Sequence, residues 1–174
     1  MTNPPDESNA AENPSESEMR QNVIQLAFGG SDARFAEFCR LIAEVVPPGT
    51  TVILRGSAVT GCRWKDRAPF DADGRGTSDL DVTMVGSGSL QFFNATGFFV
   101  PGVHSRPLSD EDPDIAPDLV PLRRRLIEMV KRPVNLQASR DIVRSFRGDL
   151  LGQPYLTLFV KPEGLSLADP VLPA

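Results

Sequence analysis

The spacing of apolar residues along the chain predicts three helices. The first follows Gly29-Gly30, is capped by Ser31 and ends before Pro47-Pro48-Gly49. Its apolar residues recur at three- and four-residue intervals, at Phe35, Phe38, Cys39, Ile42 and Val45. A second helix is predicted after Asp118, with an apolar stripe at Leu122, Leu126, Ile127 and Val130. A third is predicted after Ser139, with a stripe at Ile142, Val143, Phe146 and Leu150.

Four short segments have the pattern of β-strands. Residues 51–54, 133–138 and 155–160 are mostly apolar or β-branched and are bounded by turn residues. Residues 79–85 alternate, which places Asp79, Asp81 and Thr83 on one face of a half-buried strand. The helices and strands follow one another without a regular βαβ repeat. We therefore predict an α+β fold, in which helices flank a short mixed β-sheet.

Composition and charge divide the chain into two parts. The chain has 174 residues, of which 40% are hydrophobic, and this suits one globular domain. Residues 1–18 contain five acids and no Lys or Arg, and they are rich in Pro, Asn and Ser. We predict a disordered acidic tail at 1–18 and one folded domain at 19–174. The tail accounts for the whole net charge of -5, so the predicted domain is neutral.

This composition excludes several classes of protein. A neutral domain lacks the excess of Lys and Arg with which a nucleic-acid-coating protein displaces counterions. The chain has no apolar run of about 18 residues, so no membrane span is expected. Its N-terminus lacks the basic and apolar regions of a secretory signal. Cys39 and Cys62 are far apart and have no zinc-ligand spacing, which favours a reducing, cytoplasmic location.

Two segments carry the pattern of a phosphate and metal site. The strand at 51–54 runs into Gly56-Ser57, where the glycine permits close approach of a phosphate and Ser57 offers a hydroxyl and an N–H. Asp79 and Asp81 lie one residue apart on the next strand and point the same way. Such a carboxylate pair can bind Mg²⁺, which prefers oxygen ligands and keeps positions open for substrate phosphates.

These segments resemble the DNA polymerase β-type nucleotidyltransferase superfamily over roughly residues 50 to 140. The similarity lies in a strand that ends in Gly-Ser and in the string Gly76-Thr77-Ser78-Asp79-Leu80-Asp81. It implies a minimal polymerase β-like nucleotidyltransferase domain that uses Mg²⁺, or Mn²⁺ instead, to transfer a nucleoside monophosphate from an NTP such as ATP. Asp79 and Asp81 would be catalytic and hold the metal, and Gly56, Ser57 and Ser78 would bind the nucleotide. The acceptor, a small molecule, RNA or protein, is left open.

The chain departs from this family's pattern at the third carboxylate, which usually comes from a later strand. The matching strand carries Asn135 and Gln137, and neither side chain can ionise or act as a base. Asp118 and Asp141 are alternative sources of that acid. Three hypotheses follow: an active nucleotidyltransferase, a weakened member that binds a nucleotide or partner protein without turnover, and a toxin-like transferase acting on tRNA or a protein hydroxyl. A partner protein could also complete the site.

Other motifs have simpler interpretations. Residues 71–76 imitate the start of a calcium loop, but Arg75 and Val82 stand where oxygen ligands are needed. His104 is expected in a surface loop or turn. Arg123-Arg124-Arg125 is interpreted as a solvated helix face, with triphosphate or RNA contact as the alternative. Trp64, which lies between Arg63 and Lys65 in the loop at 61–77, either anchors that loop or stacks on a base.

Overall fold

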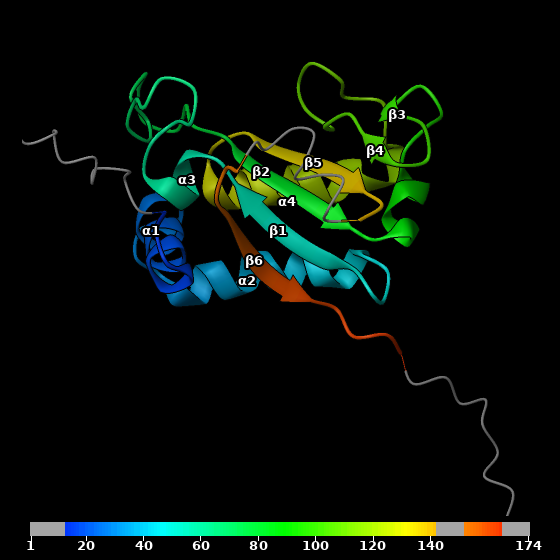
Figure 1. Cartoon of the computed structure of the whole chain (residues 1–174), viewed down its shortest axis with the longest axis horizontal. Coiled ribbons are helices and arrows are strands. Elements are labelled where there is room, and N and C mark those ends of the chain that lie inside the picture. The colour runs from blue at the N-terminus through cyan, green and yellow to red at the C-terminus, as the bar shows by residue number, and fades with distance from the viewer. Residues whose placement is uncertain (1–12, 142–151, 165–174) are drawn as a thin grey trace, which may run out of the picture.

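The computed structural model describes residues 13–141 and 152–164, and these form a six-stranded sheet with helices packed against it (Figure 1). The helices are α1 (Glu16–Phe28), α2 (Asp32–Val45), α3 (Ser57–Thr60) and α4 (Val120–Val130), with 3₁₀ turns η1 (Ser87–Phe92) and η2 (Pro117–Leu119). The strands are β1 (Thr51–Arg55), β2 (Leu80–Val85), β3 (Phe98–Val100), β4 (His104–Ser105), β5 (Val134–Ser139) and β6 (Tyr155–Val160). Their order across the sheet is β3-β4-β5-β2-β1-β6.

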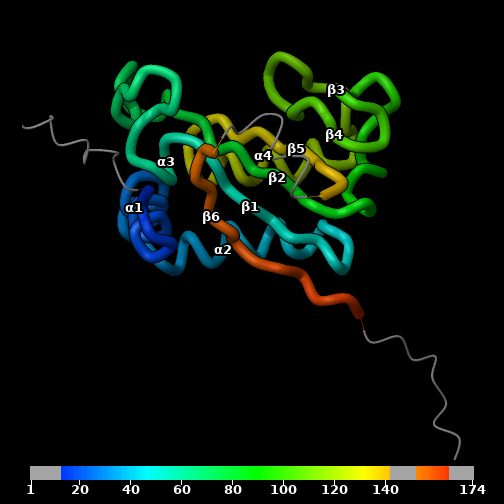
Figure 2. The backbone as a smooth tube through the Cα atoms, in the orientation of Figure 1, coloured from blue at the N-terminus to red at the C-terminus, as the bar shows by residue number. Residues whose placement is uncertain are grey.

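The sheet is mixed. β2 and β5 run parallel, and every other neighbouring pair runs antiparallel. The chain trace shows the loop before β2 and the segment around β3 and β4 as two lobes that project from one side of the molecule (Figure 2). The predicted α+β class with a mixed sheet and flanking helices is therefore confirmed.

One face of the sheet forms the core. Its buried residues face α1, α2 and α4, and Figure 1 shows α2 and α4 passing behind the strands. Among the core side chains, Phe28 contacts Phe35 and Phe38 edge to face, with ring centroids 5.4 and 5.2 Å apart. The strand residues of this face are Val52, Leu54, Leu80, Val82, Met84, Val134, Leu136, Ala138, Leu156 and Leu158. The alternate residues therefore lie on the opposite face, away from the helices.

Helix α1 is an element that the apolar spacing alone did not predict. Ser15 caps it through a capping box, in which the Ser15 hydroxyl accepts from Glu18 N–H and the Glu18 carboxylate accepts from Ser15 N–H. The helix ends at Gly29, whose φ of 61° is left-handed. The predicted boundary between tail and domain, at 18/19, therefore falls inside a helix, and residues 1–12 lie outside the described chain.

The other predicted elements differ in detail. Helix α2 is capped by Ser31 as predicted, since the hydroxyl accepts from Arg34 N–H. Asp118 caps nothing, because it lies within η2 and α4 begins at Val120. Strand β2 is not half-buried, because Thr83 on its second face is only 2% exposed. The helix predicted after Ser139 lies outside the described residues. None of the described helices has both the length and the apolar character needed to cross a membrane.

Candidate functional site

The sheet topology brings the predicted site residues to one end of three strands. Because β1 and β2 are antiparallel, the end of β1 lies beside the start of β2, and Arg55 pairs in register with Asp81. Because β5 runs parallel to β2, its start lies at the same end, where Asn135 pairs with Asp81. Gly56 follows Arg55 directly, and a Cβ built on it would lie 3.6 Å from Oδ2 of Asp81. The predicted phosphate and metal segments therefore adjoin.

A single cavity collects all five predicted site residues. It has a volume of about 330 Å³ and is lined by Gly56, Ser57, Ser78, Asp79 and Asp81. The loop between α3 and β2 supplies the rest of its lining, which is Arg63, Trp64, Lys65, Asp73 and Thr77. Three of these five carry charge and one is aromatic. We call this space the carboxylate cavity.

The amide of Asn135 joins the two carboxylates. Its Nδ2 donates to Oδ2 of Asp79 at 2.9 Å and to Oδ1 of Asp81 at 3.0 Å. The Asn135 amide nitrogen thus lies between the two carboxylates and contacts both. Gln137 lies two residues further along β5 and has other partners, since its Nε2 donates to the Ser105 carbonyl at 2.6 Å and its Oε1 accepts from Arg55 at 3.1 Å. Of the two residues considered on this strand, Asn135 is the one that contacts Asp79 and Asp81.

The surroundings of Asp79 disfavour its charged form. The pKa of Asp79 is raised, first because surrounding protein atoms displace water from its carboxylate and second because Asp81 repels its charge. The Asn135 amide and the Arg55 guanidinium offset this shift in part. A neutral amide cannot cancel two negative charges. A cation bound between Asp79 and Asp81 would therefore stabilise their charged carboxylates.

Gly56 and Ser57 occupy a tight corner between β1 and α3. Gly56 has φ of 100°, a left-handed conformation that a residue with a Cβ rarely adopts. Ser57 is buried at the first position of α3 and lines the carboxylate cavity. Helix α1 holds α3 in place, because the Asn22 side chain donates to the Val59 carbonyl at 2.9 Å.

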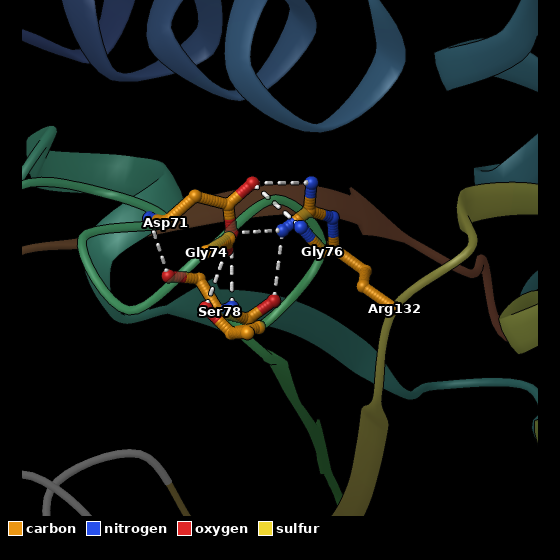
Figure 3. Close-up of polar contacts among 6 residues, drawn as sticks. Asp71, Gly74, Gly76, Ser78 and Arg132 are labelled. Atoms are coloured by element: carbon orange, nitrogen blue, oxygen red, sulfur yellow. Dashed lines mark hydrogen bonds and ion pairs between the residues drawn. The ribbon is translucent and has the colours of Figure 1, made fainter.

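A buried ion pair holds the segment before Asp79. Arg132 is 8% exposed, and it donates to both carboxylate oxygens of Asp71, at 2.8 and 3.1 Å (Figure 3). The same carboxylate accepts from the N–H groups of Gly76 at 3.0 Å and Ser78 at 2.9 Å. Arg132 also donates to the Ser78 carbonyl at 2.9 Å and lies over the Phe70 ring, 4.4 Å from its centroid. We call this set the Asp71–Arg132 clamp.

Ser78 has a structural role in the clamp that the sequence did not indicate. Its N–H, carbonyl and hydroxyl oxygen are engaged by Asp71 and Arg132, so only the hydroxyl proton is left for a ligand in the cavity. The carboxylate of Asp71 is likewise filled by protein donors, in agreement with the rejection of a calcium loop. Nothing in the sequence pairs Asp71 with Arg132, which lie 61 residues apart. Only the turn-like composition of residues 71–76 signals a structured loop.

The structure bears on three secondary interpretations, and it agrees with a solvated helix face at Arg124 and Arg125, which are both exposed. None of the three consecutive arginines of α4 is among the described residues that line the carboxylate cavity, and Arg123 instead donates to the Val134 carbonyl and pairs with Asp110. His104 is not a surface residue, because it is 9% exposed on β4 and stacks against Phe99. Trp64 is 43% exposed at the cavity edge, so it does not anchor the loop by burial.

The clamp predicts how stability depends on pH. The Arg132 side chain holds the pKa of Asp71 well below its usual range, and the Gly76 and Ser78 N–H groups lower it further. Loss of hydration on burial acts in the opposite direction but is the weaker effect. As the pH falls to about 4, the Asp71 carboxylate therefore takes up a proton in the unfolded chain but stays ionised in the folded chain. We expect the difference in unfolding free energy between wild type and Asp71→Asn to be constant above about pH 5 and to shrink below pH 4.

Urea unfolding of both proteins at pH 7, 5 and 3 measures this difference. Asp110→Asn serves as the control, because the Asp110 side chain is 81% exposed although it also pairs with an arginine. A difference for Asp71→Asn that stays the same from pH 7 to pH 3 would show that the clamp does not depend on the ionised carboxylate.

Comparison of the chain with protein-family models, with curated proteins and with solved structures finds no match. Within residues 13–141 and 152–164, no third His, Cys, Asp or Glu joins Asp79 and Asp81 in a group that could hold a metal. Asp118 and Asp141, which are both described, therefore do not supply the missing acid. The site consists of two carboxylates and a Gly-Ser corner around one cavity, with the Asn135 amide bonded to both carboxylates.

Proposed function

We propose that the carboxylate cavity binds a Mg²⁺-nucleoside triphosphate and that the chain is a nucleotidyltransferase of polymerase β-like architecture. The observation that carries the proposal is the convergence of Gly56, Ser57, Asp79 and Asp81 on one cavity from separate strands. The resemblance of these segments to that superfamily supplies the reaction: transfer of a nucleoside monophosphate to a hydroxyl or phosphate acceptor with release of pyrophosphate.

The donor set suits a hard divalent cation. Asp79 and Asp81 both present carboxylate oxygens to one nitrogen of Asn135, so the two carboxylates converge closely enough to share a cation. If the Asn135 amide turned over, its carbonyl oxygen would face the same point and supply a third oxygen ligand. Mg²⁺ held there would neutralise triphosphate charge and orient the α-phosphate for in-line attack. Asp79 and Asp81 are therefore the residues that would hold it.

The rest of the cavity offers matching contacts for a nucleotide. Gly56 has no side chain between the cavity and its backbone, which permits close approach of a phosphate. Lys65 and Arg63 add positive charge to the lining, although Arg63 also pairs with Asp66 and Asp73. The exposed ring of Trp64 lies at the edge, where it could stack on a base.

Asn135 favours a second candidate function, nucleotide binding without turnover. In the superfamily that the chain resembles, a third carboxylate assists the metal or takes the proton of the attacking hydroxyl. The neutral amide of Asn135 adds no negative charge to the metal site and cannot take that proton. The cavity would then bind a metal-nucleotide as a structural or regulatory ligand.

One incubation distinguishes the two functions. The purified chain is mixed with Mg²⁺ and each NTP labelled at the α-phosphate, with RNA, protein and small-molecule fractions of a cell extract as acceptors. Label on an acceptor together with released pyrophosphate, both absent with Asp81→Asn, supports transfer. Saturable NTP binding without release supports the second function. If no NTP binds in the presence of Mg²⁺ or Mn²⁺, both are wrong.

Restoring the acid at position 135 is a direct test of the metal geometry. We expect Asn135→Asp to lower the melting temperature without metal, because three carboxylates then crowd one point. With Mg²⁺ present, we expect about tenfold tighter metal binding, since each added charged ligand strengthens a hard cation site. Calorimetry and thermal unfolding with and without Mg²⁺ measure both effects. Asn135→Ala is the matched control and should show no gain. Unchanged metal affinity in Asn135→Asp would contradict the proposed site.

A further inference from the structure

A second cavity lies on the other side of the loop that carries the clamp. It has a volume of about 530 Å³ and is formed where the end of α1, the start of α2 and the end of α4 meet this loop. Alternate parts of the loop line the two spaces, since Asp73 and Thr77 face the carboxylate cavity while Asp71, Arg75 and Gly76 face the second one. Its full lining is Leu26, Ala27, Gly29, Arg34, Asp71, Arg75, Gly76, Val130, Lys131 and Arg132. We call it the basic cavity.

The charges of the basic cavity are strongly unequal. Arg34, Arg75, Lys131 and Arg132 line it, and Asp71 is the only acid among its lining residues. The Asp71 carboxylate is fully engaged by Arg132 and by two backbone N–H groups. The other three cations therefore have no counterion within the lining. Concave walls of one sign concentrate the field and attract an ion of the opposite sign.

Two of the four cations already have partners in the fold, since Arg34 donates to the Met129 carbonyl and Arg132 is paired with Asp71. The other two, Arg75 and Lys131, are the donors available to a ligand. Neither Arg75 nor Lys131 forms an ion pair with another residue of the described chain. Arg132 is 8% exposed, and its Nε has no hydrogen-bond partner in the described structure. A buried N–H of a charged group without an acceptor is costly, but protein atoms cover this one, so it is not counted among the contacts of an anion in the cavity.

The walls of the basic cavity are held in place by close backbone contacts. Gly76 has φ of 78°, and a Cβ there would lie 3.0 Å from the Lys131 carbonyl, so the loop packs directly against the end of α4. Lys131 and Asp71 themselves have φ of 54° and 57°, which is uncommon for residues other than glycine. Lys131 therefore projects from a position fixed by the fold.

We propose that the basic cavity is a binding site for the oligophosphate group of a small molecule, separate from the proposed metal site. Guanidinium and ammonium groups donate to phosphate oxygens, and a diphosphate offers enough oxygens to engage several of these donors at once. The concave form of the cavity, with walls from three helices and a loop, favours a small molecule over an extended nucleic acid strand. This proposal does not depend on nucleotidyl transfer.

Inorganic pyrophosphate is the probe, added to the full chain in EDTA so that no metal contributes. We expect saturable binding by calorimetry, with NMR shifts at the amides of Gly29, Gly76 and Lys131. The double variant Arg75→Gln/Lys131→Gln should bind at least about tenfold more weakly, because two charge-assisted donors are lost. The matched control, Arg124→Gln/Arg125→Gln, removes the same charge from an exposed part of α4 and should bind within twofold of wild type.

Three results would overturn the proposal. The first is equal pyrophosphate affinity in the double variant and the control, which would make the attraction a general effect of charge. The second is a set of NMR shifts confined to Gly56 and Ser57, which would place the anion in the carboxylate cavity instead. The third is binding of a single-stranded oligonucleotide with no binding of pyrophosphate. Failure of Mg²⁺-NTP binding at Asp79 and Asp81 would leave the pyrophosphate result unaffected, so the two proposals fail separately.

Discussion

Asp79→Asn and Asp81→Asn are each expected to reduce Mg²⁺-dependent nucleotide binding and transfer by at least about a hundredfold, because each removes one of two anionic ligands. The chain should remain folded, since both side chains lie at the cavity and outside the apolar core. Asp79→Asn should even melt at a higher temperature than wild type without metal. The folded state raises the pKa of Asp79 and so disfavours its charge, a cost that the neutral amide escapes.

Thermal unfolding with and without Mg²⁺, together with nucleotide titration, measures these effects. Asp73→Asn is the matched control, because Asp73 lines the same cavity but its side chain is 68% exposed and pairs with Arg63. It should keep nucleotide binding within about twofold of wild type, as is usual for an exposed ion pair. If Asp73→Asn weakens binding as much as Asp81→Asn, the metal is placed wrongly within the cavity.

Arg132→Met is expected to cost about 3 kcal/mol of unfolding free energy, because it breaks a largely buried ion pair by removing one partner. The substitution also removes the hydrogen bond to the Ser78 carbonyl and the contact with the Phe70 ring. Ser78 directly precedes Asp79, so a looser clamp should also displace the metal ligand. We therefore expect weaker Mg²⁺ binding in Arg132→Met even at temperatures where the protein is fully folded.

Urea unfolding gives the stability change, and calorimetry of Mg²⁺ binding at low temperature gives the second effect. Arg40→Met is the control: Arg40 pairs with both Glu37 and Glu44, but its side chain is 52% exposed. Its loss should cost less than about 1 kcal/mol and leave Mg²⁺ affinity unchanged. Equal costs for the two variants would mean that the Asp71–Arg132 clamp contributes no more than a surface pair.

The sequence predicted the strands of the site because their signals are local. Alternation in 79–85 and the apolar run at 51–54 mark β2 and β1, and Gly56-Ser57 marks the corner that follows. The pattern of residues 133–138 likewise predicted β5, and strand periodicity determines which of its side chains share a face. That this strand lies beside the two acids was implied only by the family resemblance, which left Asn135 and Gln137 as alternatives.

The features that escaped prediction depend on contacts between distant residues. The pairing of Asp71 with Arg132 leaves no trace in local composition, although it controls the backbone on which Asp79 sits. The burial of His104 results from its place in a two-residue strand beside β5, which is too short to show periodicity. Helix α1 differs, because its Ser15–Glu18 capping box and terminal Gly29 are local signals that the acidic composition of the segment obscured.

The central claim, that Asp79 and Asp81 form a divalent metal site, is tested most directly by titrating Mn²⁺ into the isotopically labelled chain. Mn²⁺ broadens the NMR signals of nuclei near its binding site, whether or not the protein turns over a substrate. The account predicts that substoichiometric Mn²⁺ first removes the amide signals of Gly56, Asp79, Asp81 and Asn135, that Mg²⁺ restores them, and that Asp81→Asn abolishes the effect. Broadening centred on the acidic stretch Asp110–Asp114, or broadening at the cavity that survives in Asp81→Asn, would contradict it.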